Sequence, residues 1–467
     1  MDPLTHERAG SSLLAARPTR QESYEAGRSR RKALARSAHA ELTVPAADRD
    51  PLAILAHQDE TRLSDLVPIR YGRMVPTPFT FLRGAAAVMA HDLAASPHTG
   101  LVVQLCGDAH LSNFGAYAGP DRRLVFDLND FDETLPGPFE WDLKRLTASL
   151  VVAARDNGFP GDAGPAAAAE AVRSYREAIT HFASIPMMDT WYQRMEAESI
   201  MDMAGESADV HQRVERAVKK ASRRTSLQAF EKLTAVVDGR RRIVADPPLV
   251  VPLEEDELPG ITRRVSAAFE EYRTSLAGDR RHLLDRFRYV DLARKIVGVG
   301  SVGTRCLILL LEDDSGAPLF LQAKEADRSV LEAHLPASRY RNHGRRVVEG
   351  QRLMQATSDI FLGWSHDAEG EVDFYFRQLR DMKYSGDIAS LIPETFLRYA
   401  ALCGAVMARA HARSGDAAAI SGYVGKGGTF DSAISSWAVA YADQTERDHE
   451  MLVEAVADGR VDAVRGV

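Results

Sequence analysis

Cysteine is scarce in this chain. Its 467 residues include three cysteines, Cys106, Cys306 and Cys403, which are widely spaced and odd in number. They form neither a metal-ligand pair nor a disulfide framework, so we expect a reducing, cytoplasmic location. Long apolar runs are also missing, since no stretch approaches the ~18 residues of a membrane span. The N-terminal run "SSLLAA" is too short for the core of a signal peptide, and no membrane association is expected.

An excess of positive charge is absent too. The formal net charge is -8, which gives no overall attraction to nucleic acid or to an anionic membrane, so neither is expected as a partner. The hydrophobic fraction of 45% and the charged fraction of 27% are those of an ordinary globular protein. We find no internal repeat and no low-complexity segment, and the length suggests roughly two to four domains or lobes.

Four segments are predicted along the chain. Residues 1–50 are expected to form a weakly ordered basic tail, and residues 51–287 a helical lobe. Residues 288–385 alternate in the manner of strands, with a turn at "DDSG", and residues 386–467 return to helices that we expect to pack on the helical lobe. Because helices and strands are segregated along the chain, the predicted fold class is α+β.

The stretch "CGDAHLSNFG", residues 106–115, follows the predicted strand "LVVQL". Phosphoryl transfer from ATP needs a carboxylate to orient the attacking hydroxyl, and oxygen ligands that hold Mg²⁺ against the phosphates. In kinase catalytic loops the base and a metal-binding Asn lie five residues apart, and Asp108 and Asn113 have this spacing. A further carboxylate, Asp130, follows on the next predicted hairpin in "NDFD". The spacing predicts a site for ATP and Mg²⁺.

Two further aspartates bear on this site. Asp142 in "EWDLKRL" is twelve residues past Asp130, where we expect a carboxylate on the following helix to brace the catalytic loop through its backbone amides. Asp127 competes with Asp130 for the metal role, but its position favours the end of a strand.

Other interpretations of these motifs are weaker. "GDAH" is also found in metallophosphoesterases, but the further Asp and the Gly-Asn-His motif of such a dimetal site are missing. "DLNDFDE" is not an EF-hand loop, because Asp132 stands at the sixth position, where Gly is required. A turn and a solvated loop would explain each motif separately, but the agreement of three spacings favours the phosphoryl-transfer site.

A glycine-rich stretch, "GVGSVG", covers residues 298–303 and supplies the candidate phosphate-binding residues Gly298, Gly300, Ser301 and Gly303. A dinucleotide-binding fold would place a helix after the glycines. The sequence instead continues into the strand "TRCLILLL", which favours a loop whose backbone amides close over phosphates.

The second strand of this hairpin carries Lys324, which is predicted to contact the α- and β-phosphates of ATP. Glu349 is the candidate for its ion-pair partner, and Glu332 is the alternative. The strand "DFYFRQL" is predicted to lead into a hinge, where backbone groups around Gln378 and Leu379 would meet adenine.

The catalytic segment precedes the nucleotide-binding segment in this chain. The expected architecture is therefore a circularly permuted, protein-kinase-like fold of two lobes, which is tolerable when the chain ends lie close together at the surface. "ARAHARSGDAA" imitates a second catalytic loop, but Ser421 stands where Asn is needed five residues after Asp416. We interpret that stretch as a helix and its cap.

The two acidic motifs resemble those of the aminoglycoside phosphotransferase and choline kinase branch of kinase-like proteins, which read His-Gly-Asp-x-His-x-x-Asn and Ile-Asp-Phe-Asp/Glu. The resemblance implies that Asp108 is the catalytic base and that Asn113 and Asp130 bind Mg²⁺, with Asp132 as the candidate auxiliary ligand. It implies that His110 braces the loop. Cys106 stands where these families have the first His, which leaves the role of that side chain open.

Over about residues 25–450 the chain resembles the bacterial family called domain of unknown function 2252. The motifs that carry this resemblance include "LVPIRYGRM", "FDLNDFDET", "PGPFEWDLKRL" and "GQRLMQATSDIFLGW". The resemblance implies a relationship to kinases but no substrate.

Three functions are compatible with these motifs. The first is an ATP- and Mg²⁺-dependent phosphotransferase with a small-molecule acceptor, because the segment from Asp130 to Asp142 is too short for a long activation loop. The second is a nucleotidyl transferase using the same site. The third is a nucleotide-binding regulatory pseudoenzyme, against which the presence of Asp108, Asn113, Asp130 and Lys324 argues.

Overall fold

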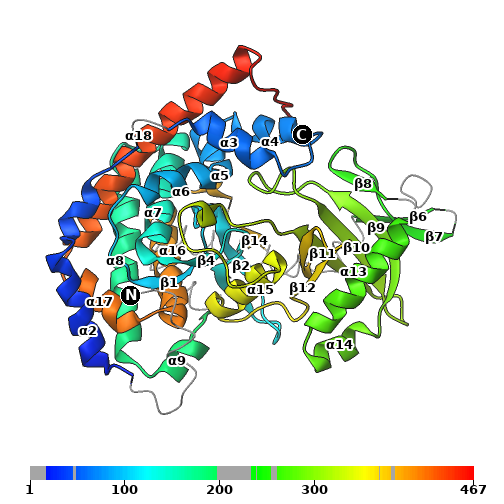
Figure 1. The fold of residues 1–467 in the computed structure, drawn as a ribbon, viewed down its shortest axis with the longest axis horizontal. Helices are drawn as coiled ribbons and strands as arrows, with labels where there is room; N and C mark the ends of the chain where they lie inside the picture. The colour runs from blue at the N-terminus through cyan, green and yellow to red at the C-terminus, as the bar shows by residue number, and fades with distance from the viewer. Residues whose placement is uncertain are drawn as a thin grey trace.

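A computed structural model describes residues 17–45, 49–196, 233–237, 239–253, 260–367, 369–379, 384–385 and 387–467. Within these ranges, most helices gather on one side of the molecule and a large antiparallel sheet lies on the other (Figure 1). The protein is therefore a mixed α+β structure, as the sequence predicts. None of the helices in these ranges has the length and apolar character of a membrane span.

The helical part is built around a group of long helices that share the largest apolar core. Helix α16 packs on α8, and α18 packs on both α7 and α8, so the C-terminal helices pack on the earlier helices of this part, as the sequence predicts. The bounds of this group are α7 (Phe139–Asp156), α8 (Ala163–Ser184), α16 (Pro393–Ser414), α17 (Ala417–Val424) and α18 (Thr429–Ala457). Asp416 caps α17 by accepting a hydrogen bond from Ala419 N at 2.9 Å, so the second "catalytic loop" is a helix cap, as predicted.

Shorter helices come from the first hundred residues; α3 to α6 lie near the top of the view in Figure 1, while α2 packs beside α17. They are α2 (Arg20–Ser29), α3 (Pro51–Asp59), α4 (Val67–Met74), α5 (Pro78–Gly84) and α6 (Ala86–Ala94); α9 (Met187–Tyr192) follows α8.

The large sheet has six strands in the order β12-β13-β11-β10-β9-β8, and each neighbouring pair is antiparallel. The apolar side chains of one face pack against α13, where Tyr272 stacks on Phe376 with ring centroids 4.1 Å apart. The strands are β8 (Val250–Pro252), β9 (Arg288–Lys295), β10 (Cys306–Glu312), β11 (Pro318–Glu325), β12 (Gly363–His366) and β13 (Asp373–Gln378). The accompanying elements are β6 (Thr234–Val237), β7 (Arg240–Ile243), α13 (Ile261–Ser275), α14 (Gly278–Leu284) and α15 (His343–Met354).

Two small sheets hold the acidic motifs within the helical part. Strand β1 pairs with β4, so the ends of the segment 106–134 are fastened together. The second small sheet has four strands in the order β14-β2-β3-β5. Its two central strands, β2 and β3, belong to the segment 106–134, and β14 and β5 pair with them from outside that segment. The strands are β1 (Val102–Leu105), β2 (Phe114–Ala118), β3 (Leu124–Leu128), β4 (Leu135–Pro138), β5 (Met195–Glu196) and β14 (Tyr384–Ser385).

The prediction of a weakly ordered tail over residues 1–50 is wrong for residues 20–40. Helix α2 begins with a capping box, in which Thr19 and Glu22 exchange side-chain to backbone hydrogen bonds. The Thr-x-x-Glu spacing was visible in the sequence and is the signal that could have predicted this helix. Residues 1–16 and 46–48 lie outside the described residues.

The basic residues after α2 have structural roles. Arg31 and Arg36 donate hydrogen bonds to carbonyl oxygens at the C-terminal end of α17, including the carbonyl of Val424 at 2.8 Å from Arg36. Cationic side chains are stabilised where a helix leaves its last carbonyls unpaired. These arginines are therefore not a solvated tail.

The predicted boundary at residues 287/288 is displaced. Strand β8 pairs with β9, and α13 packs on β12, so residues from about 240 onward belong with the six-stranded sheet and not with the helical part. At the other end, β14 pairs with β2 and so belongs to the helical part. The physical reason is the apolar face of α13, which packs against the sheet.

Arg49 provides a test of how the N-terminal segment is held. Its side chain is 6% exposed and bonds Asp92 at 2.6 Å and Asp448 at 2.7 Å, which joins the segment to α6 and α18. Replacing Arg49 by Ala leaves two buried carboxylates without their cation, and we expect the free energy of unfolding to fall by about 3–5 kcal/mol in denaturant titrations.

Arg155→Ala is the matched control, because Arg155 pairs with Asp443 at the surface and such pairs contribute roughly 0–1 kcal/mol. Equal losses in the two variants would contradict the role of Arg49.

Candidate functional site

A cleft between the helical part and the six-stranded sheet brings together residues that the sequence predicted separately. Its walls come from α5, from the segments after β1 and β3, from the glycine-rich stretch and from the end of β11. The predicted residues that line it are Asp108, His110, Asn113, Asp130, Asp132, Gly298, Gly300 and Ser301.

Asp142, in the first turn of α7, holds the loop that follows β1. Its carboxylate accepts hydrogen bonds from the backbone N–H groups of Cys106 at 2.7 Å and Gly107 at 3.0 Å. The prediction that Asp142 braces the loop through backbone amides is confirmed. Behind it, His411 lies 3.2 Å from Asp142 and 2.9 Å from the Tyr175 hydroxyl, all within the core.

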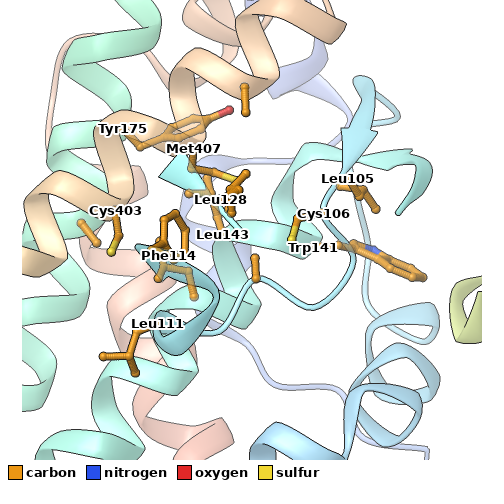
Figure 2. Close-up of a cluster of buried hydrophobic side chains, with 14 of the residues drawn as sticks. Leu105, Cys106, Leu111, Phe114, Leu128, Trp141, Leu143, Tyr175, Cys403 and Met407 are labelled. Atoms are coloured by element: carbon orange, nitrogen blue, oxygen red, sulfur yellow. The ribbon is translucent and has the colours of Figure 1, made fainter. Parts of the chain in front are cut away.

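Cys106, which stands in place of the first His of the related motif, has a packing role. Figure 2 shows its side chain in the apolar cluster that also holds Phe114, Leu128 and Leu143. The Cys106 thiol donates to the Asp130 carbonyl at 3.1 Å, and burial raises the pKa of this thiol well above its usual value. A neutral thiol thus links the loop after β1 to the loop after β3.

Asp108 is anchored by a cation from the same helix as Asp142. Arg145 Nη2 lies 2.6 Å from Asp108 Oδ1, and Arg145 Nε donates to the same oxygen at 2.8 Å. Nη2 also donates to the Leu82 carbonyl at 2.6 Å. Burial raises the pKa of Asp108, although Arg145 and Arg83 act in the opposite direction. Because Arg145 holds Oδ1, Oδ2 is the Asp108 oxygen left for the proton-accepting role that the sequence predicts.

His110 lies beside Asp108 in a neutral state. Its Nε2 is 3.6 Å from Asp108 Oδ2, its ring meets Phe79 edge-on, and burial lowers the pKa of His110 well below its usual value. The backbone N–H of His110 donates to the Asp108 carbonyl at 2.8 Å, which tightens the turn. The position fits a residue that shapes the loop.

Asn113 and Asp130 present oxygen atoms to the cleft. Asn113 Nδ2 donates to the Asp108 carbonyl at 2.7 Å, so the amide oxygen is the atom left for a cation. Asp130 is 31% exposed and lies 3.9 Å from Lys324 Nζ. The competing candidate, Asp127, is buried in β3 and bonds Arg409 at 2.5 Å, so it is a structural residue of the strand.

Asp132, which lines the cleft, forms an ion pair with Lys324 of β11. Lys324 Nζ lies 2.5 Å from Asp132 Oδ2, and the Tyr375 hydroxyl donates to Oδ1 at 2.7 Å. Burial acts to raise the pKa of Asp132, but Lys324 and Tyr375 outweigh it and lower the pKa to about 2. Burial acts to lower the pKa of Lys324, and the two aspartates outweigh it and raise that pKa. Both groups are therefore charged at neutral pH.

The donor set suits Mg²⁺ only if a ligand completes it. The described residues contain no group of three or more His, Cys, Asp or Glu side chains that could hold a metal ion alone. Mg²⁺ in proteins commonly takes one or two carboxylates and completes its shell with water and substrate phosphates. Asp130, Asp132 and the Asn113 amide oxygen match that requirement in type and number.

The glycine-rich stretch is a loop between β9 and β10 with no helix after it, as expected for a loop over phosphates. Gly298 and Gly303 have φ of +69° and +98°, which favours glycine at both positions. Arg73 donates to the Gly298 carbonyl at 2.6 Å, and Leu63 N to the Gly303 carbonyl at 2.8 Å. The loop is thus held against α4 and the segment before it.

The predicted pairing of Glu349 with Lys324 is wrong. Glu349 lies 3.9 Å from Arg352 on its own helix, while Lys324 contacts Asp132, Asp130 and Ser301. Glu332, the alternative, lies near Arg328. The carboxylates that lie beside Lys324 are those of Asp130 and Asp132, in the loop after β3.

The predicted adenine contacts at Gln378 and Leu379 stay a prediction, although both backbone N–H groups there already have partners. The Gln378 N–H donates to the Asp359 carboxylate, and the Leu379 N–H donates to the Phe320 carbonyl at 2.9 Å. Gln378 lines a second polar pocket, apart from the residues of the main cleft. The other residues of that pocket are Tyr117, Ala118, Asn129, Gln351, Gln355, Asp359 and Arg377.

Several arginines at this site escaped sequence reasoning. Arg145, Arg83 and Arg346 come from three helices and carry no motif of their own. Arg346 of α15 donates to the carbonyls of Asp132 and Thr134, both at 2.9 Å. The nearest signal for Arg145 was its position three residues after Asp142, on the same helical face.

Gly107 tests the loop geometry. Its φ is +87°, and a Cβ atom there would lie 2.3 Å from the Glu133 carbonyl oxygen. Gly107→Ala should lower the free energy of unfolding by at least about 1–2 kcal/mol, the cost of left-handed backbone for other residues, with the clash in addition. Gly161→Ala is the control in thermal melts, because a Cβ atom added at Gly161 would have no atom within 4 Å other than those of its neighbours in the chain. Identical melts for both variants would show that the loop is not constrained as described.

The comparisons with known proteins identify the family. The model of the family described as "Uncharacterized protein conserved in bacteria (DUF2252)" matches residues 62–455, and the chain belongs to this family. The comparison with curated proteins gives no match, and neither does the comparison with solved structures.

Proposed function

We propose that this member of the DUF2252 family is an ATP- and Mg²⁺-dependent phosphotransferase that acts on a small-molecule acceptor. One observation carries the proposal. Lys324 of β11 lies 2.5 Å from Asp132 and 3.9 Å from Asp130, and these two aspartates line the cleft together with Asp108 and Asn113. A phosphate-binding lysine, two metal carboxylates, an amide oxygen and a base are the groups that phosphoryl transfer requires.

The order of elements around the sheet supports a circularly permuted, kinase-like arrangement. The glycine-rich loop joins β9 to β10, the antiparallel neighbour β11 carries Lys324, and α15 follows before β12 and β13. In kinases a glycine-rich loop also precedes a strand that carries the phosphate-binding lysine, and a helix follows. The acidic loops lie earlier in the chain, within the helical part.

In the proposed reaction, Asp108 Oδ2 accepts the proton of the acceptor hydroxyl. The acceptor oxygen forms a bond to the γ-phosphorus of ATP, while the bond from that phosphorus to the β–γ bridging oxygen breaks and ADP leaves with the electron pair. Asp130, Asp132 and Asn113 would hold Mg²⁺, which neutralises charge on the phosphates. When Mg²⁺ and ATP are bound, the Lys324 ammonium group would turn from the two aspartates toward the phosphates.

The metal ligands provide the first test of this proposal. Asp130→Asn and Asn113→Ala should each weaken the binding of ATP in the presence of Mg²⁺, because each removes a ligand charge or oxygen. Titration calorimetry with and without Mg²⁺ measures this effect. Asp121→Asn is the control, because Asp121 is half-exposed and pairs with Arg194 away from the cleft. Unchanged Mg²⁺–ATP affinity in both ligand variants would remove the assigned metal site.

The base provides the second test. Asp108→Asn should reduce ATP turnover by about 10²–10⁴-fold and leave ATP affinity nearly intact, since a base for the acceptor does not contact the nucleotide before reaction. The amide oxygen of Asn can still accept from Arg145, so the fold should persist. Lys324→Ala should instead weaken both binding and turnover. Full ATPase activity in Asp108→Asn would exclude Asp108 as the base.

A further inference from the structure

Arg83 is a cation at the cleft that none of the preceding roles uses. It lies in α5 and lines the cleft together with Asp108, Asn113 and Asp130. Its Nε atom is buried without a hydrogen-bond partner, and within the described residues no hydrogen bond or ion pair joins its guanidinium to an acceptor. Arg83 is half-buried at the cleft wall, so a ligand that enters the cleft can supply the anion for its guanidinium.

The other arginines around the cleft have partners. Arg145 bonds Asp108, and Arg346 bonds the Asp132 and Thr134 carbonyls. Arg62 donates to the Val302 carbonyl in the glycine-rich loop. Asp108 therefore does not need Arg83 for neutralisation, although the two charges interact.

The position of Arg83 indicates which anion it meets. A Cβ atom at Gly300 would lie 3.1 Å from the Arg83 carbonyl oxygen, so the residue touches the glycine-rich loop. It also lines the same cleft as Asp108, and its charge acts to lower the pKa of that carboxyl. Arg83 thus touches the loop expected over the phosphates and shares the cleft with the base expected at the acceptor.

We propose that the Arg83 guanidinium binds the γ-phosphoryl group of ATP during its transfer to the acceptor, which makes Arg83 a further catalytic residue. The inference rests on the proposed function. A planar guanidinium offers paired N–H donors that match two phosphoryl oxygens, and it remains charged when buried. An arginine supplied in this way contributes 10³–10⁵-fold to turnover in other phosphoryl-transfer enzymes.

The experiment uses Mg²⁺–ADP with aluminium fluoride, a mimic of the phosphoryl group in flight, and the full-length protein. Retention of ADP after gel filtration measures trapping, and Mg²⁺-dependent ATP hydrolysis, with water as a slow acceptor, measures turnover. We expect Arg83→Ala to lower turnover on the order of 10³-fold and to abolish trapping. Affinity for Mg²⁺–ADP alone should change by less than about twofold, because the leaving nucleotide does not contact Arg83.

Arg83→Lys keeps the charge and loses the planar fork, so it should trap ADP at least about tenfold more weakly than the wild type. It also carries the test if Arg83→Ala fails to fold. Arg286→Ala is the matched control: Arg286 is 66% exposed beside Asp314 and does not line the cleft.

Wild-type trapping in folded Arg83 variants overturns the inference and leaves the proposed function standing. A wild-type protein that neither binds Mg²⁺–ATP nor traps Mg²⁺–ADP overturns the proposed function and the inference with it.

Discussion

The ion pair between Lys324 and Asp132 is the contact on which the arrangement of the site depends. Lys324 is 2% exposed, and such a cation is stable in the interior only with a partner at short distance. The pair joins β11 of the large sheet to the loop that follows β3. Arg346 adds two hydrogen bonds from α15 to the backbone of the same loop. The sheet and the helical part therefore meet at residues 130–134, which is where the candidate metal ligands lie.

The charged side chains at the cleft form ion pairs of opposite sign. Asp132 faces Lys324, and Asp108 faces Arg145. Acidic side chains still outnumber basic ones along the walls, because Glu133, Glu325 and Asp327 also line them. Such a surface repels a free nucleotide and attracts a divalent cation, so a triphosphate is favoured there mainly as its Mg²⁺ complex. This electrostatic balance is consistent with the type of metal ligands that the sequence motifs supply.

The spacing of residues in the sequence predicted those features that depend on a single loop or on the start of a single helix. The bracing role of Asp142, the loop at residues 298–303 and the helix cap at Asp416 all follow from patterns within a few residues. The partner of Lys324 did not follow, because Glu349 and Asp132 are distant in sequence and only the packing of α15 decides between them. The same limit applies to Arg83 and Arg145, because no motif in the sequence gave either arginine a role.

The N-terminal segment shows a different kind of limit. Composition suggested a solvated basic tail, but the acceptors for Arg31 and Arg36 are carbonyls of α17, nearly four hundred residues later. Arg49 likewise finds one of its carboxylates in α18. Charge-rich segments are ordered when distant helix ends or buried acids need a cation, and no local pattern reveals this. The boundary of the sheet part was misplaced for a similar reason, since the burial of α13 depends on β12 and β13.

The most direct test of the central claim is the fate of each phosphate of ATP. The protein is incubated with ATP labelled at the γ- or the α-phosphate, with Mg²⁺ or with a chelator, and with a small-molecule extract as the source of acceptor. A phosphotransferase moves the γ-label to a new compound only when Mg²⁺ is present, and it leaves the α-label in ADP. Transfer of the α-label would instead indicate a nucleotidyl transferase, and ATP that stays intact under all conditions would contradict a catalytic role for this cleft.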